Sequence, residues 1–204
     1  MPLQLYDKEK ILDACLTVFA RHGYKNTSAA MLAEVAGISK SLIFHHFKSK
    51  KELYLGVLER CLENARTEIN IDPLTEYQDF FEAKEKLSII KLEYFKRHPN
   101  EYKVLMEAFQ ATPKELKADI EKMLEPLMTV RDKLWKQLFA QVPLREGVDR
   151  KQALELIELT LKHFENEFLA GVADCKELDA SYWQCFLAKR NNFLDMIRYG
   201  IERE

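Results

Sequence analysis

Residues 27–50 read TSAAMLAEVAGISKSLIFHHFKSK and are the most informative part of the sequence. This stretch predicts two short helices joined by a tight turn. Thr27 can cap the first helix, because its hydroxyl can accept a hydrogen bond from a free N–H group at a helix start. Gly37 follows a small and apolar run, where a helix often ends in a left-handed residue, and Ser39 can cap the second helix. The spacing is typical of a helix–turn–helix, in which the small Ala33 lets the helices cross closely.

The composition favours a helical protein of ordinary apolar content. The 204 residues include only six glycines and six prolines, while Leu, Glu, Lys and Ala are abundant. No apolar run reaches the roughly 18 residues that a transmembrane helix needs. The first residues, MPLQLYDKEKIL, are too charged for a secretory signal. The sequence therefore predicts a cytoplasmic protein without a membrane partner.

Charge is distributed unevenly along the chain. The formal net charge is only −2, yet residues 1–51 carry eight Lys or Arg against four acidic residues. The remainder is therefore acidic. A basic head on an acidic body suits a protein that touches DNA with one end only.

Hydrophobic periodicity predicts helices throughout the rest of the chain. No alternating strand pattern and no internal repeat stands out, so the expected fold class is all-α with about nine helices. Beside the two helices above, the expected ranges are 6–21 (ending at His22-Gly23), 51–67, 76–97, 101–110, 112–142 (capped by Thr112, with a kink or short break at Pro126), 149–170 (ended by Gly171) and 181–201.

These helices suggest three functional parts. Residues 1–50 form a three-helix head, and 51–72 form a linking helix whose first half closes the core of the head. Residues 73–204 form a larger domain, whose last two helices suit dimerisation. The last two helices are amphipathic and rich in aromatic residues, so each can bury one face within its own subunit and present another face to a second copy of the chain.

Residues 6–62 resemble the DNA-binding head of the TetR family of bacterial transcriptional regulators. The resemblance rests on Phe19-Ala20-Arg21-His22-Gly23, on Thr27-Ser28, on the run from Leu32 to Lys40, and on Phe47-Lys48-Ser49-Lys50-Lys51-Glu52-Leu53. It covers about a quarter of the chain by motif. The remaining helices match the family only in number and length.

The resemblance implies an all-helical homodimer that pairs through its last two helices and binds a double-stranded DNA operator. A small molecule bound in the body would move the linking helix and change the distance between the heads. Positions that commonly face bases are Lys40, Ser41, Leu42 and Phe44, and positions that commonly touch phosphates are Thr27, Ser28, His46 and Lys50. Hydroxyl, N–H and ammonium groups at such positions suit phosphate oxygens.

One position departs from the family pattern. The family usually has Tyr where this chain has Phe44, which lacks a hydroxyl for a phosphate contact. His46 could supply that contact instead. Leu42 can only pack or touch a thymine methyl group, so base reading along this helix is expected to be sparse.

The histidine pair and the lysines beside it have alternative interpretations. Adjacent residues on a helix point about 100° apart, so His45 and His46 cannot easily chelate one metal ion, and we predict no metal site. Backbone contact with DNA by at least one of them is the preferred interpretation, and plain surface polarity is the alternative. A lysine cluster is usually a solvated face, but Lys48, Lys50 and Lys51 directly follow the expected recognition helix and are therefore interpreted as phosphate contacts.

Aromatic and methionine side chains of the body are candidates for an apolar effector pocket, although each is more often a core residue. The candidates are Tyr94, Tyr102, Met106, Phe109, Trp135, Phe139, Phe164 and Phe168.

For catalysis the sequence offers no recognisable motif, so neither an enzyme nor a cofactor is predicted. The predicted function is a transcriptional regulator, acting as a repressor, that a small apolar effector releases from its operator. The sparse base-reading inventory leaves an alternative, a helical ligand-sensing module that acts through protein partners. The sequence specifies neither the effector, the operator nor the regulated genes.

Overall fold

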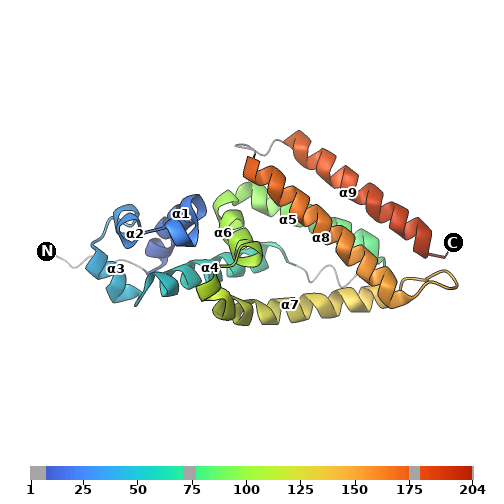
Figure 1. The fold of residues 1–204 in the computed structure, drawn as a ribbon, viewed down its shortest axis with the longest axis horizontal. Coiled ribbons are helices and arrows are strands. Elements are labelled where there is room, and N and C mark those ends of the chain that lie inside the picture. The colour runs from blue at the N-terminus through green and yellow to red at the C-terminus, as the bar shows by residue number, and fades with distance from the viewer. Residues whose placement is uncertain (1–7, 71–76, 175–179, 204) are drawn as a thin grey trace. The chain divides into compact units, whose positions relative to one another are not determined.

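The computed structural model consists of α-helices and describes residues 8–70, 77–174 and 180–203, with the backbone alone for 165, 168–174, 180, 181 and 183. Figure 1 shows the helices in chain order, and the described part contains no named strand. The all-α prediction is confirmed. The helices are α1 Lys8–Asn26, α2 Ala29–Val35, α3 Lys40–His46, α4 Lys50–Glu68, α5 Phe80–Arg97, α6 Pro99–Gln110, a 3₁₀ turn at Lys114–Leu116, α7 Lys117–Ala140, α8 Arg150–Asp174 and α9 Ala180–Ile201.

Two compact units divide the chain. The first comprises residues 1–73 and 87–132, and the second comprises 74–86 and 133–204. Helices α5 and α7 therefore contribute to both units. A division by contacts need not follow function, so the three functional parts expected from the sequence stay a prediction.

The core of the first unit joins the N-terminal helices to α4 and α6. Phe19 of α1 and Ile43 of α3 lie in one buried cluster with Leu58 of α4. The same cluster includes Val104 and Leu105 of α6. The expectation that α4 closes the core of the head is therefore incomplete, because α6 shares that role. Helix α6 follows α3 by some fifty residues, and amphipathic periodicity alone does not say which core a helix joins.

Serine caps both helices of the helix–turn–helix. Ser28 Oγ accepts a hydrogen bond from the Met31 N–H at 3.3 Å, and Ser39 Oγ accepts one from the Leu42 N–H at 3.2 Å. Gly37 has the expected left-handed backbone, with φ at 66°. The prediction that Thr27 caps α2 is wrong. Its hydroxyl donates to the Gly23 carbonyl oxygen at 2.7 Å, and its side chain is buried.

Predicted helix ends differ from the structure at several places. Gly23 breaks α1 as expected, with φ 70° and ψ 169°, although a further helical turn follows it. Thr112 does not cap a helix, because its hydroxyl donates back to the Ala108 carbonyl oxygen. Helix α7 continues through Pro126, so the predicted short break is absent, while the alternative of a kink there stays a prediction. Gly171 does not end α8, since a glycine inside a helix costs only about 1 kcal/mol relative to alanine.

Predicted starts at Tyr6 and Glu76 lie outside the described residues. No described helix is both long and apolar enough to cross a membrane.

In the second unit, aromatic rings pack where the helices meet. Phe164 of α8 makes edge-to-face contacts with Phe186 and Phe193 of α9, at ring-centroid distances of 5.9 and 5.3 Å. Phe80 at the start of α5 packs similarly against Trp135 and Phe139 of α7. Such contacts fix the packing of one face of each helix.

Candidate nucleic-acid interface

Helix α3 separates a buried face from an exposed polar face. Ile43 and Phe47 anchor the helix, each with only 1% of its surface exposed. The expected contact residues Lys40, Ser41, Phe44 and His45 are exposed, while Leu42 and His46 are half-buried. The structure therefore brings six of the predicted residues together on one short helix.

The two histidine rings of α3, those of His45 and His46, lie close together but are not parallel. Their ring centroids are 5.7 Å apart and the ring planes meet at 77°. Among the residues that the structure describes, no group of three or more potential metal ligands gathers. His45 is exposed and His46 is half-buried at the end of α3.

The three lysines after α3 have different surroundings. Lys48 is exposed. Lys51 forms an ion pair with Asp119 of α7, with 2.7 Å between the Lys51 Nζ and the Asp119 carboxylate. That bond lowers the pKa of the Asp119 carboxyl group. Lys50 points inward and donates to two backbone carbonyl oxygens, those of Tyr24 at 2.8 Å and Thr27 at 2.9 Å.

The two candidates for phosphate contact before α2, Thr27 and Ser28, also differ in their surroundings. Ser28 is exposed beside the helix start. Thr27 is buried and its hydroxyl is occupied by the Gly23 carbonyl, as described above. Sequence position alone could not separate these neighbours, because one backbone step turns a side chain from solvent to core.

Aromatic candidates for the effector pocket fall into both units. Tyr94 and Tyr102 are buried in the first unit, where Met106 is half-buried and Phe109 is exposed. Those in the second unit, Trp135, Phe139 and Phe164, are buried, and the side chain of Phe168 lies outside the described residues. Their role in effector binding stays a prediction.

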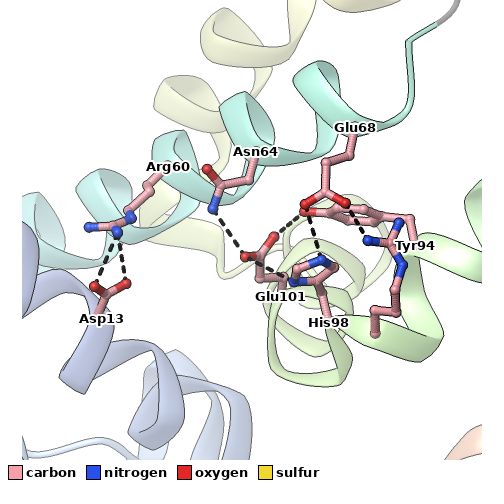
Figure 2. A network of polar contacts seen from close by, with 8 residues as sticks. Asp13, Arg60, Asn64, Glu68, Tyr94, His98 and Glu101 are labelled. Carbon is pink, nitrogen blue, oxygen red and sulfur yellow. Dashed lines mark hydrogen bonds and ion pairs between the residues drawn. The ribbon is translucent and has the colours of Figure 1, made fainter.

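A polar network that the sequence analysis missed joins α4 to α5 and α6 (Figure 2). Buried Glu101 accepts hydrogen bonds from the Tyr94 hydroxyl and, at 3.1 Å, from the Asn64 amide. His98 lies between Glu101 and Glu68, with its Nε2 3.1 Å from the Glu68 carboxylate. Burial, followed by the bond to Glu101, raises the pKa of the Tyr94 hydroxyl far above its usual range. The network fixes the second half of α4.

The middle of α4 is tied to α1 by ion pairs. Arg60 forms ion pairs with Glu9 and with Asp13, the latter at 2.9 Å. These ion pairs are largely exposed, so each contributes little to stability by itself. Together with the buried network, these ion pairs connect the linking helix α4 to α1, α5 and α6. No single local pattern in the sequence could have identified partners so far apart along the chain.

Comparison with known proteins identifies the N-terminal region. Residues 11–57 match the sequence profile of the bacterial regulatory proteins of the tetR family. Over 125 residues the chain is 30% identical to the HTH-type transcriptional regulator RutR of Escherichia coli strain K12, covering 58% of this chain and 57% of RutR. Over 55 residues it is 42% identical to the HTH-type transcriptional activator FasR of Mycolicibacterium smegmatis, covering 27% of this chain and 25% of FasR.

Comparison of the fold with solved structures extends the similarity beyond the N-terminal region. A crystal structure of the transcriptional regulator FadR from Bacillus subtilis, in complex with stearoyl-CoA, matches with a TM-score of 0.66. It shares 16% identity, and the match covers 94% of this chain and 97% of FadR. Residues 11–57 therefore match the tetR-family profile, and over 94% of its length the chain shares the fold of FadR. The match with RutR, however, spans little more than half of RutR's length.

Proposed function

We propose that this protein is a DNA-binding transcriptional regulator that represses its target genes until a small-molecule effector releases it. The observation that carries the proposal is the exposed polar face of α3, held by buried Ile43 and Phe47 within a tetR-family domain. A short helix with Lys, Ser and His exposed suits the major groove, where such groups meet phosphates and base edges. Such a regulator acts in the cytoplasm, where bacterial DNA lies.

The proposed DNA contacts come from exposed or half-exposed residues around α3. Phosphate contacts are assigned to Ser28, His46 and Lys48, with His45 as a further polar contact. Base contacts are assigned to residues on the first turns of α3, Lys40, Ser41, Leu42 and Phe44. Because Leu42 and Phe44 lack hydrogen-bonding groups, phosphate and shape contacts should contribute more to affinity than base edges do.

A homodimer through α8 and α9 is part of the proposal. The two helices leave large apolar side chains exposed, which is unusual for a surface that faces only water. A symmetric dimer would cover this surface and present two copies of α3 to major grooves about 34 Å apart along the DNA. The exposed side chains are Leu156, Leu159, Phe193, Met196 and Tyr199.

The proposed effector is a small and largely apolar molecule. The aromatic and methionine residues of the body support an apolar effector, and the FadR structure of similar fold holds stearoyl-CoA. To reduce the fraction of protein that can bind DNA from 99% to 1%, the effector must bind the released state more tightly than the DNA-binding state by about 5.5 kcal/mol.

A gel-shift experiment with fragments of the source genome tests the proposal. The full-length protein is expected to select a small set of fragments at physiological salt and to release them when an effector is added. Apolar effectors can first be sought by the increase that they cause in the unfolding temperature. A pure dimer that prefers no fragment would contradict DNA regulation and favour a sensor that acts through protein partners.

A further inference from the structure

The segment from the break at Gly23 in α1 to the start of α2, residues 23–28, is called the connector here and is built around a buried tyrosine, Tyr24. Gly23 breaks the helix with φ at +70°, so the Tyr24 N–H has left the regular helical ladder. Thr27 closes the connector by donating from its hydroxyl to the Gly23 carbonyl oxygen. The path of this segment sets where α2, and with it α3, begins.

A carboxylate from α6 holds one end of the Tyr24 residue. Glu107 accepts the Tyr24 N–H with both oxygens, at 2.9 and 3.2 Å, and accepts the Tyr54 hydroxyl of α4 at 2.9 Å. A Cβ atom on residue 23 would lie 2.8 Å from a Glu107 oxygen, so only glycine allows this approach. Hydrogen bonds to a carboxylate are about twice as strong as neutral ones.

An ammonium from the start of α4 holds the other end. Lys50 Nζ donates to the carbonyl oxygens of Tyr24 and Thr27 and lies 4.4 Å above the centre of the Tyr24 ring. The same ring packs edge-on against Tyr54, with centroids 5.1 Å apart. Tyr24 is thus held by an anion at its N–H, by a cation at its carbonyl oxygen, and by the same cation and Tyr54 at its ring.

We propose that Glu107 and Lys50 are positioning residues, which set the helix–turn–helix for DNA binding without touching DNA themselves. The inference rests on the proposed DNA-binding function and assigns Lys50 a role different from the phosphate contact that its sequence position suggests. The Lys50 ammonium gives two of its three N–H donors to carbonyl oxygens and lies over a ring, so at most one donor is left for a phosphate. Glu107 lies on α6, so a body helix contributes directly to the geometry of the head.

The first experiment measures operator affinity for variants of Glu107, using the full-length protein and the DNA fragment that the wild type selects. Glu107→Leu keeps the volume but leaves the Tyr24 N–H unpaired, and it should weaken binding by about tenfold. Glu107→Gln keeps one acceptor and should restore most of the loss. Glu93→Gln, at an exposed position of α5, is the matched control and should bind like the wild type. Circular dichroism checks that every variant is folded.

The second experiment separates positioning from phosphate contact by the dependence of affinity on salt. Each phosphate contact contributes about 0.9 to the slope of log affinity against log salt, so a dimer that loses one contact per head loses about 1.8. Lys48→Met should reduce the slope by this amount. Lys50→Met should weaken binding while leaving the slope unchanged. Combined with Glu107→Leu, it should cost less than the two single losses together, because both act on Tyr24.

Three outcomes would contradict parts of the proposal differently. If the wild type selects no fragment, the DNA-binding function fails and the positioning role fails with it. If the wild type binds DNA and Glu107→Leu binds equally well, the function stands and the role of Glu107 is wrong. If Lys50→Met reduces the salt slope as Lys48→Met does, Lys50 contacts phosphate and is not a positioning residue.

Discussion

The surface of α3 and the surface of α8 and α9 both expose side chains, but of opposite kinds. Helix α3 exposes Lys40 and His45 above a buried apolar anchor. Helices α8 and α9 expose Leu159, Met196 and Tyr199, which are 60%, 61% and 72% exposed. A cationic surface gains by displacing the ions around a polyanion, whereas an apolar surface gains by leaving water. The contrast is the one expected if, as proposed, α3 contacts DNA and α8 and α9 contact a second subunit.

The largest expected effect is on the apolar surface. The double substitution Leu159→Glu with Met196→Glu places four carboxylates in a symmetric dimer interface, where burying an unpaired charge is very costly. We expect the dimer dissociation constant, measured by analytical ultracentrifugation, to rise by more than about a thousandfold. Val130→Glu on α7, at a position 57% exposed, is the control and should leave the dimer intact. An unchanged dimer in the double variant would show that the dimer does not form through these exposed faces of α8 and α9.

A smaller effect is expected from reversing one charge on α3. Lys40→Glu removes an attraction to DNA and adds a repulsion at each half-site, so operator affinity should fall by about a hundredfold while the dimer persists. Fluorescence anisotropy with the selected fragment measures the loss. The control Lys96→Glu, on the exposed face of α5, should change affinity little. Regulation that survives Lys40→Glu unchanged would favour the interpretation in which the protein acts through protein partners.

Removing the cap of α3 should have a modest effect on stability. Ser39→Ala leaves the Leu42 N–H without its side-chain acceptor and should lower the free energy of unfolding by about 1 kcal/mol. Chemical denaturation measures the change. Thr67→Ala removes a hydroxyl that only bonds back to the Glu63 carbonyl within α4, and it should cost nothing measurable. Equal losses in the two variants would mean that the Ser39 cap contributes nothing specific.

The smallest expected effect near neutral pH concerns Tyr54. Burial first, and then the neighbouring Glu107 carboxylate, raise the pKa of its hydroxyl from 10.0 to well above the usual range. Because the folded pKa exceeds the unfolded one, the stabilisation is complete below pH 10 and is lost as pH rises further. The unfolding temperature should therefore show no contribution from Tyr54 between pH 7 and 9. Tyr54→Phe should reduce the decline of the unfolding temperature above pH 10. An identical decline in the wild type and in the variant would show that the Tyr54 hydroxyl does not cause it.

Much of the scaffold could be predicted from the sequence, because helix formation depends on neighbouring residues. The turn at Gly37 and the cap at Ser39 are local features, and both are confirmed. The cap predicted at Thr27 is wrong by one residue, because Ser28 offers the same chemistry. Helix ends at Gly171 and Thr112 were mispredicted because a local signal is weak when packing favours another arrangement.

The order of the helices and the match of residues 11–57 to the tetR-family profile follow from the amino-acid sequence. The surroundings of the three lysines after α3 follow only from how the helices pack. Lys48 is exposed, Lys51 is paired with Asp119, and Lys50 is bound to the connector before α2. The reason is physical: the partners of Lys50 lie 23 and 26 residues away, and Glu107 lies 83 residues from Tyr24, so packing alone brings them together.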